Sequence, residues 1–396
     1  MPFDVNDLRS ARVIFVGVAN NSFKEVVHMS LPKSSAFFVI RILVACCLLP
    51  AASTLARDDG AIVARKAYTF PAYEQAVQTS DVERYTDKVS YETAVNDSRF
   101  EFEKLTYLSD GLKVVAYLYK PKENGRKFPT IIYNRGSAVR GDIAPELIAL
   151  FHRVASEGFV VLAPMLRQSD GGEGRDELGG ADVDDVMNVL PLARSLAFVD
   201  MDNLFMCGES RGGMMTYQAI KRGFPLNAAA VVGAFTDMQA VIDTHAKQYP
   251  PALLKQIWPD YEEHKDEIAK TRSAIFWADQ LNVPLLIMHG GNDRSVNTEQ
   301  SLALAEELQK LGRVYELIVY ADDNHTLSKN QEDRDRRAID WFKKYLKKKA
   351  VGLRTPDTAV KDQESELKTQ NSGVISQNSK LGTFDSRFLT DTCPDT

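Results

Sequence analysis

The chain has 396 residues, of which 44% are hydrophobic, so it can bury a sizeable core in one large domain or two smaller ones. Its formal net charge of -6 argues against a nucleic-acid partner, because contacts to phosphate require a basic surface. The four cysteines imply no disulfide framework, and no spacing of His, Cys and Asp residues suggests a metal site.

The N-terminal stretch, residues 1–56, is expected to be an extension that carries a secretory signal. An apolar run over residues 36–49 is followed by a small-x-small cleavage site at residues 54–56, and Met29 is the expected true start. Because the run is short for a membrane span, we expect export to the periplasm or the extracellular space, with no stable membrane insertion of the mature chain. A membrane anchor formed by about residues 29–56 is the alternative.

An antiparallel hairpin is the expected start of the main domain. Residues 100–107 and 112–119 both alternate apolar and polar side chains, and the turn sequence Ser109-Asp110-Gly111 separates them. Residues 57–99, which precede the hairpin, are polar with scattered aromatic side chains. We expect this segment to pack on the main domain rather than to form a domain of its own.

Strand and helix patterns alternate after the hairpin. The predicted strands cover residues 130–133, 159–163, 204–207, 228–232, 283–288 and 314–320. The predicted helices cover residues 144–157, 181–197, 214–222, 297–312 and 334–348, and Asn297 with Gln300 is expected to cap the fourth of them. Such alternation predicts an α/β fold, with a mostly parallel central sheet and helices on both faces. We expect this domain to span residues 100–349 and a disordered polar tail to cover residues 350–396.

The motif Gly208-Glu209-Ser210-Arg211-Gly212-Gly213 lies between a predicted strand and a predicted helix, as a G-x-S-x-G nucleophile elbow does. Gly208 and Gly212 remove side chains that would clash in a sharp turn, so Ser210 is expected to stand above the sheet as a nucleophile. The amide of Arg211 begins the helix, where its N–H and the helix dipole favour a developing oxyanion.

A serine nucleophile needs a base and an acid that orients the base, and in this fold class the chain order is Ser, Asp or Glu, His. Asp293 directly follows the predicted strand 283–288, and His325 directly follows the last predicted strand. Both side chains are therefore expected at the carboxyl edge of the sheet, beside Ser210. His289 is the competing base, but its position at a strand end favours a structural role.

The second oxyanion donor is expected from the loop that follows the strand 130–133. This loop reads Asn134-Arg135-Gly136-Ser137, and Gly136 would let the backbone approach a substrate. Either Asn134 or Arg135 is a candidate donor, and the sequence does not decide which atom donates.

Two further stretches remain open to more than one interpretation. The acidic, glycine-rich loop with Glu173, Asp176 and Glu177 is either a solvated loop or a binding site for the cationic end of a substrate. The aromatic-rich helical stretch from Tyr249 to Trp277 either covers the active-site cleft or packs in the core.

With these motifs in place, residues 100–348 resemble the catalytic domain of the prolyl oligopeptidase family, within the α/β-hydrolases. The matching stretches are Ser109-Asp110-Gly111-Leu112, Gly174-Arg175, Gly179-Gly180-Ala181-Asp182, the elbow from Gly208 to Gly213, and His289-Gly290-Gly291-Asn292-Asp293. The second elbow glycine, Gly213, narrows the match beyond hydrolases in general. The resemblance implies that Ser210, Asp293 and His325 are nucleophile, orienting acid and base, and that no cofactor is required.

Two features depart from the family pattern. Members usually carry a β-propeller before or around the catalytic domain, and residues 57–99 are too few to form one. Their oxyanion loop often reads His-Gly-Gly or contains a tyrosine, whereas this chain has Asn134-Arg135-Gly136.

Three functions are compatible with these residues. The first is a secreted serine peptidase that acts through an acyl-enzyme, and the second is a carboxylesterase that acts on small acyl esters. The third is a hydrolase-fold binding protein that has lost its activity. The expected partner is thus a peptide or a small ester, and the sequence does not indicate an oligomeric state.

Overall fold

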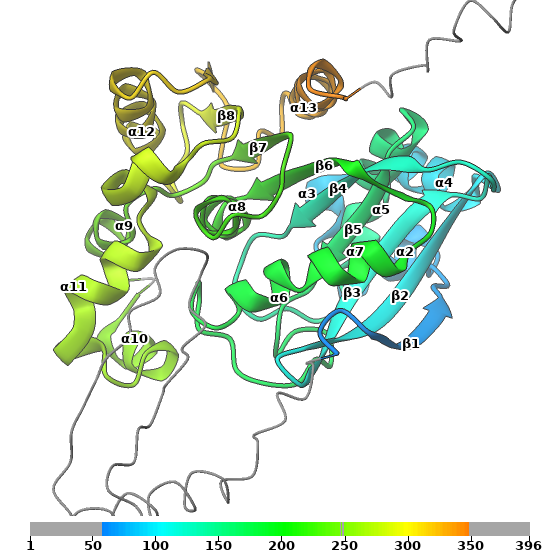
Figure 1. The fold of residues 1–396 in the computed structure, drawn as a ribbon, viewed down its shortest axis with the longest axis horizontal. Coiled ribbons are helices and arrows are strands. Elements are labelled where there is room, and N and C mark those ends of the chain that lie inside the picture. The colour runs from blue at the N-terminus through cyan, green and yellow to red at the C-terminus, as the bar shows by residue number, and fades with distance from the viewer. Residues whose placement is uncertain (1–57, 246, 248, 348–396) are drawn as a thin grey trace, which may run out of the picture. The chain divides into compact units, whose positions relative to one another are not determined.

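The computed structural model describes residues 58–347, except 246 and 248 (Figure 1). The expected signal at residues 29–56, with the proposed start at Met29, and the expected tail at residues 350–396 lie outside the described residues. Among the helices within the described part, none is both long and apolar enough to cross a membrane. The fold below belongs to one compact unit that ends at Tyr345.

A sheet of nine strands forms the centre of this unit. The strands are β1 (Ile62–Ala67), β2 (Phe100–Ser109), β3 (Leu112–Pro121), β4 (Phe128–Asn134), β5 (Val160–Pro164), β6 (Val199–Glu209), β7 (Ala228–Val232), β8 (Leu285–Gly290) and β9 (Tyr315–Tyr320). Their order across the sheet is β1-β2-β3-β5-β4-β6-β7-β8-β9. Pairing is antiparallel from β1 to β5 and parallel from β5 to β9, which confirms the predicted mostly parallel sheet.

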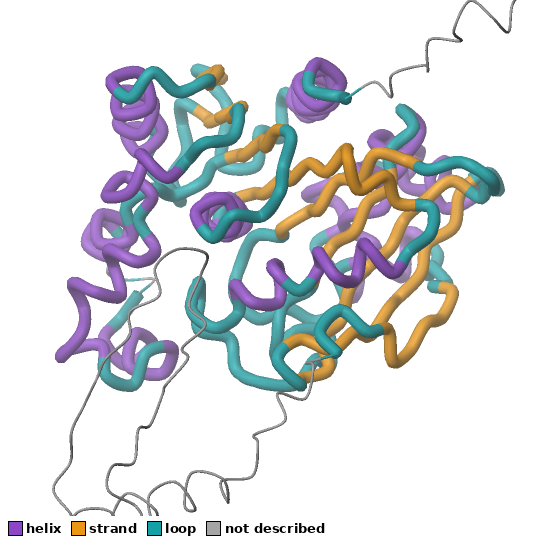
Figure 2. The backbone as a smooth tube through the Cα atoms, viewed as in Figure 1, coloured by secondary structure: helices purple, strands orange, loops and turns teal. Residues whose placement is uncertain are grey.

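Helices cover both faces of the sheet, as the alternating pattern predicts (Figures 1 and 2). The helices are α2 (Tyr73–Thr79), α3 (Val82–Tyr85), α4 (Lys88–Asn96), α5 (Ala144–Ser156), α6 (Val183–Met187), α7 (Val189–Ser195), α8 (Arg211–Lys221), α9 (Met238–Thr244), α10 (Pro251–Ile257), α11 (Tyr261–Arg272), the 3₁₀ helix η3 (Ala274–Gln280), α12 (Glu299–Lys310) and α13 (Gln331–Lys344). Helices α5 and α13 contact each other and one face, while α7, α8 and α12 contact strands from the other face.

The described residues before Phe100 form one strand and three short helices. β1 extends the sheet by pairing with β2, and α3 and α4 contact α5. Tyr68 and Phe70 place their rings 5.3 and 5.0 Å from the ring of Phe102, measured between centroids. The segment is therefore built into the sheet and into one helical layer.

One local prediction is wrong, and another is only partly confirmed. The single helix predicted over residues 181–197 is divided into α6 and α7 at Asn188, because Pro191 lacks an N–H and is tolerated only in the first turn of a helix. The predicted cap formed by Asn297 and Gln300 is half present at the start of α12: Asn297 Oδ1 accepts from the amide of Glu299 at 3.1 Å, but the Gln300 side chain has other partners. Gln300 instead accepts hydrogen bonds from the amides of Thr236 and Asp237, at 2.7 and 3.0 Å.

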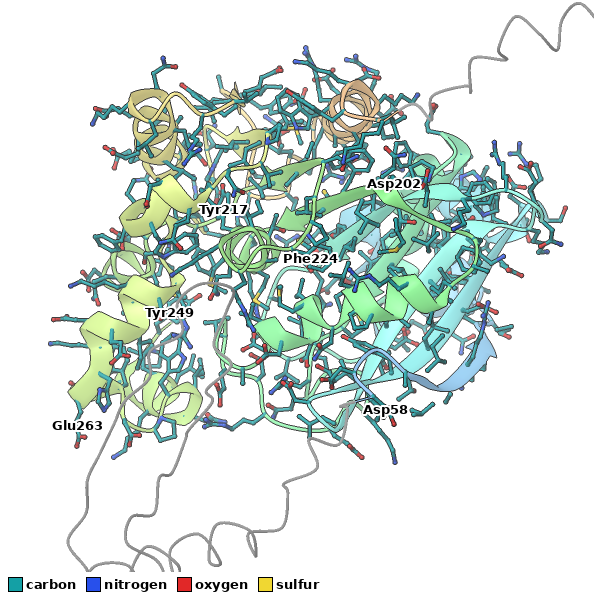
Figure 3. All side chains as sticks on the ribbon, viewed as in Figure 1. Asp58, Asp202, Tyr217, Phe224, Tyr249 and Glu263 are labelled. Carbon is teal, nitrogen blue, oxygen red and sulfur yellow. The ribbon has the colours of Figure 1, made fainter. Side chains whose placement is uncertain are left out.

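The stretch from Tyr249 to Trp277 lies at the edge of the domain, where Figure 3 labels Tyr249 and Glu263, and some of its aromatic side chains are buried in the core. Trp258 and Trp277 are both buried in the hydrophobic core. Their indole N–H groups donate to the carbonyls of Glu177 and Lys270, at 2.7 and 3.0 Å. Burial of both rings with satisfied N–H groups explains the aromatic content of this stretch without a covering role.

A buried ion pair joins three distant parts of the domain. Asp185 on α6 is fully buried, and its carboxylate accepts from the Arg167 amide at 2.7 Å and from the Arg167 guanidinium at 2.8 and 3.0 Å. The same carboxylate accepts from the hydroxyl of Ser109, at the end of β2, at 2.7 Å. These contacts hold the loop after β5 against the β2–β3 turn.

We expect Asp185→Ala to lower the free energy of unfolding by about 3 kcal/mol or more, because Arg167 then keeps only the more exposed Asp110 as an ionic partner. The neighbouring Asp184→Ala is the matched control. Asp184 forms a partly exposed pair with Arg222, so its loss is expected to cost less than about 1 kcal/mol. Urea denaturation of both variants measures the difference, and equal losses would contradict this assignment.

Candidate active site

The turn that carries Ser210 joins β6 to α8 and has a strained backbone. Ser210 has φ 54° and ψ -119°, a region that residues with a side chain rarely occupy. Its amide donates to the carbonyl of Val232, at the end of β7, at 2.8 Å, and its carbonyl accepts from the amide of Gly213 at 2.9 Å. Hydrogen bonds on both sides thus hold Ser210 in this conformation at the carboxyl edge of the sheet.

The three glycines of the elbow lie where no side chain fits. A Cβ atom on Gly212 would lie 1.9 Å from the carbonyl oxygen of Asn134, and one on Gly208 would lie 2.2 Å from the carbonyl oxygen of Gly212. A Cβ atom on Gly213 would lie 2.2 Å from the Cβ of Ala234. The sharp turn therefore depends on close packing of α8 against the ends of β4 and β7.

Asp293 and His325 are brought together from the ends of β8 and β9. The distance between Asp293 Oδ2 and His325 Nδ1 is 2.6 Å. A carboxylate can only accept, so Nδ1 carries the proton in this pair and Nε2 is left as the basic nitrogen. Asp293 Oδ1 accepts from the amides of Ser295 and Val296, at 2.8 and 2.9 Å, which fixes the orientation of the carboxylate.

His289 supports Asp293 instead of competing with His325. Its ring is fully buried, with Nδ1 2.6 Å from the Ser301 hydroxyl and Nε2 3.1 Å from Asp293 Oδ2. Burial alone would raise the pKa of Asp293, but hydrogen bonds from His289 and His325, together with the amide of Val296, hold this pKa well below its usual range. The carboxylate therefore stays ionised between the two rings.

Two residues that position His325 were not identified from the sequence. Asp323 is fully buried, and its carboxylate accepts from the amides of Asn324, Lys329 and Asn330, at 2.8, 3.2 and 3.1 Å. A Cβ atom on Gly233 would lie 3.0 Å from His325 Nδ1, so a glycine there makes room for the ring. The sequence Asp322-Asp323-Asn324-His325 marks this loop as part of the site, but it does not indicate that Asp323 is buried while Asp322 is exposed.

The side chains of Asn134 and Arg135 do not point toward a reacting group. Asn134 Nδ2 donates to the hydroxyl of Thr216 at 3.0 Å. The Arg135 guanidinium is buried and donates to four carbonyls and the Ser169 hydroxyl. The loop instead approaches the nucleophile at Gly136, where a Cβ atom would lie 3.5 Å from the Cβ of Ser210. The side chains of Asn134 and Arg135 therefore hold the loop in place, and the backbone of the loop comes close to Ser210 at Gly136.

The side chain of Arg211 is also structural, and it corrects the interpretation of the acidic loop at Asp176, whereas Glu173 is exposed as a solvated loop would have it. Its guanidinium is 2.6 and 2.7 Å from the carboxylate oxygens of Asp176 and 2.6 Å from Asp182. All three side chains are at most 5% exposed. Because its partner is Arg211, Asp176 is neither solvated nor free to bind a cationic substrate. The Arg211 amide keeps its place at the first position of α8.

Ser210 and His325 line a single pocket, and part of its wall comes from the N-terminal segment. Arg84 and Tyr85, from α3, line this pocket together with Arg140. Nothing in the sequence indicated this wall, because residues 57–99 carry no motif that links them to the elbow. Within the described ranges, no group of three or more His, Cys, Asp or Glu side chains is arranged to hold a metal ion.

The sheet, the elbow at its carboxyl edge, and the Asp293–His325 pair define an α/β-hydrolase. The model of the prolyl oligopeptidase family matches residues 147–349, so the chain belongs to this family. The resemblance inferred from the sequence motifs is thereby confirmed.

The region matched to this chain makes up a different share of each relative's length. The uncharacterized peptidase YtmA of Bacillus subtilis (strain 168) is 29% identical over 60% of this chain and 92% of its own. The acylaminoacyl peptidase of Pyrococcus horikoshii is 20% identical with a TM-score of 0.52, over 68% of this chain and 45% of its own. The acetyl xylan esterase of Paenibacillus sp. R4 is 17% identical with a TM-score of 0.52, over 63% of this chain and 86% of its own. These two structures share the fold with this chain, which spans less than half of the acylaminoacyl peptidase.

Gly212→Ala is expected to lower the free energy of unfolding by about 3 kcal/mol or more, because its Cβ would overlap the backbone of Asn134. Gly141→Ala is the matched control, since a Cβ at Gly141 has no neighbour within 4 Å and this glycine has no positive φ. Thermal and urea denaturation compare the two. A Gly212→Ala protein as stable as the control would contradict the packing described for the elbow.

The lowered pKa of Asp293 predicts a pH-dependent stability. Its folded-state pKa lies below the unfolded value of about 3.9, so its contribution is complete above about pH 5 and is lost as the pH falls further. We therefore expect the stability difference between the wild type and Asp293→Asn to shrink between about pH 5 and pH 2. Urea denaturation across this range tests it. Asp322→Asn, at an exposed pair with Lys329, should give a small difference throughout, and an Asp293→Asn difference that does not change with pH would refute the prediction.

Proposed function

We propose that the protein is a serine hydrolase in which Ser210 attacks a carbonyl carbon and forms an acyl-enzyme. The observation that carries this proposal is the 2.6 Å contact between Asp293 and His325, in the pocket that also contains Ser210. The strained backbone of Ser210 and the close approach of Gly136 supply the surroundings that such chemistry requires.

In the proposed reaction His325 carries out both proton transfers, and Asp293 orients its imidazole. His325 Nε2 accepts the Ser210 proton as the C–O bond forms, while Asp293 holds the imidazole in the tautomer with a protonated Nδ1. The tetrahedral oxyanion is stabilised by the Arg211 amide and by a backbone amide near Gly136. The protonated His325 then donates to the leaving group, and water repeats the sequence to release the acyl group.

A peptidase is the first candidate for the substrate class. Membership of the prolyl oligopeptidase family supports it, as does the relative YtmA, a peptidase by name that matches this chain over 92% of its own length. An amide requires protonation of a poor leaving group, and the paired His325 is suited to that step.

A carboxylesterase is the second candidate. The acetyl xylan esterase of Paenibacillus sp. R4 shares the fold over 86% of its chain, so the same architecture is used for ester hydrolysis in a protein of comparable extent. Among the described residues before Phe100, Arg84 and Tyr85 line the pocket. The same catalytic groups serve esters and amides, so the fold suits small esters as well as peptides.

Labelling with a fluorophosphonate probe tests the nucleophile. We expect the wild-type protein to be labelled at Ser210 and Ser210→Ala to remain unlabelled, with a loss of at least about 10⁴-fold in kcat. Circular dichroism of both proteins controls for folding. Failure of folded wild-type protein to react with the probe would favour an inactive hydrolase-fold binding protein.

A second prediction concerns the orienting acid. Asp293→Asn should reduce kcat by about 10³- to 10⁴-fold, because the amide no longer selects the correct imidazole tautomer. Asp322→Asn, at an exposed acid three residues before His325, is the matched control and should keep its activity. A paired panel of X-Pro amides and short acyl esters, assayed with wild type and both variants, then decides between peptidase and esterase. Turnover of esters alone would select the second candidate.

A further inference from the structure

The charge on the wall of the proposed active-site pocket is unbalanced. Three arginines, Arg84, Arg135 and Arg140, line the pocket, together with Glu146 and Glu209. Burial raises the pKa of both carboxyl groups, which reduces their tendency to carry negative charge. Positive charge is therefore in excess beside the proposed nucleophile and base.

Two of the three guanidinium groups are committed to the protein. Arg140 lies 2.7 Å from Glu146 and has Asp81 as a second, more distant carboxylate at 3.7 Å. Arg135 is almost fully buried and holds its own loop through carbonyl oxygens and the Ser169 hydroxyl. Neither group can turn to a ligand without breaking these contacts.

Arg84 is different because its guanidinium is exposed and uncommitted. Among the residues that the structure describes, the Arg84 guanidinium forms no hydrogen bond or ion pair, although the Arg84 backbone does, and the guanidinium lies 5.9 Å from the centroid of the Tyr85 ring. Its positive charge nevertheless acts on Glu209, the residue directly before Ser210. Arg84 therefore adds positive charge to the pocket that Ser210 lines, and no described carboxylate forms an ion pair with it.

The backbone that carries Arg84 is fixed. Val82, on the same turn of helix, is fully buried, and the amide of Asp81 donates to Glu146 at 3.2 Å. After the turn, the carbonyl of Thr86 accepts from the hydroxyl of Tyr73 at 3.3 Å. Arg84 thus lines the pocket from an anchored helix, so its backbone loses little conformational entropy when a ligand binds.

We propose that Arg84 forms a subsite for a carboxylate group located close to the scissile carbonyl of the substrate. A guanidinium matches a carboxylate with two parallel hydrogen bonds, and an uncommitted one beside a nucleophile selects for substrates that supply this group. The substrate class is therefore esters or amides of acidic acyl or leaving groups. This inference rests on the proposed function, because it takes Ser210 as the nucleophile.

The test uses two pairs of esters that differ only in charge. Mono-4-nitrophenyl glutarate and its methyl ester place the charge on the acyl side, and 3-acetoxybenzoate and its methyl ester place it on the leaving group. We expect the wild type to prefer the charged member of at least one pair by about tenfold in kcat/KM. Because Arg84 is exposed, this preference should fall as the salt concentration rises.

Three variants separate the role of Arg84 from general effects. Arg84→Gln should abolish the preference for the charged ester and keep turnover of the neutral one, while Arg84→Lys should retain part of it. Arg126→Gln is the matched control, since Arg126 is also exposed but lies outside the pocket, beside Glu123. An unchanged ratio of charged to neutral kcat/KM in Arg84→Gln, for both pairs, would overturn the subsite.

A binding measurement tests the Arg84 subsite separately from the proposed hydrolase activity. Turnover of the neutral esters that Ser210→Ala abolishes supports the hydrolase, whatever the role of Arg84. If no ester is turned over, the proposed function fails, and titration of Ser210→Ala with glutarate and with dimethyl glutarate decides the subsite alone. Tighter binding of glutarate that is weakened by Arg84→Gln supports it, and equal binding of the two compounds rejects it.

Discussion

The active site depends on a backbone contact between the start of α8 and the end of β4 that is too close to admit a Cβ atom. Gly212, at the start of α8, lies against the carbonyl of Asn134 at the end of β4, and Gly208 and Gly213 allow equally close contacts on either side. Because β4 and β6 are neighbours in the sheet, this contact determines how far the loop 134–137 stands from Ser210. The strained φ of Ser210 is maintained by the hydrogen bonds that its amide and carbonyl make within the same packed turn.

Buried cations fix the loops around this contact. The Arg211 guanidinium is paired with Asp176 and Asp182, and the Arg135 guanidinium is surrounded by carbonyl oxygens of its own loop. A charge removed from water must be matched by acceptors, so each arginine requires one particular arrangement of the segments that supply them. Burial lowers the pKa of Arg135 to about 9, yet its five oxygen partners all suit a donor. These arginines act on the site through the backbone that they hold.

The segment before the hairpin contributes both to the fold and to the pocket. β1 adds an antiparallel edge strand, and α3 packs on α5 and supplies Arg84 and Tyr85 to the pocket wall. The wall that this segment supplies is a short helix with one uncommitted guanidinium, which makes substrate charge the property to test.

The sequence alone was sufficient for the fold class and for the groups that meet at the sheet edge. Local periodicity determines strands and helices, and the elbow glycines are readable because only a residue without a side chain fits such a turn. The order of Ser210, Asp293 and His325, each directly after a strand, predicted that they converge, since parallel strands end at the same edge. The structure brings Asp293 and His325 into contact and places Ser210 in the same pocket.

Only the tertiary structure decided which polar side chains have protein partners and which are left to bind a ligand. Asp176 belongs in the sequence to an acidic loop that looks solvated, but it is the buried partner of Arg211, 35 residues away along the chain. Gln300 has the spacing of a helix-capping residue, but its side-chain oxygen instead accepts hydrogen bonds from the amides of Thr236 and Asp237. Arg84 belongs to no sequence motif. It lines the same pocket as Ser210 because α3 packs on α5. Local sequence determines the conformation of a segment, whereas the partner of a charged or polar group depends on which distant segments fold against it.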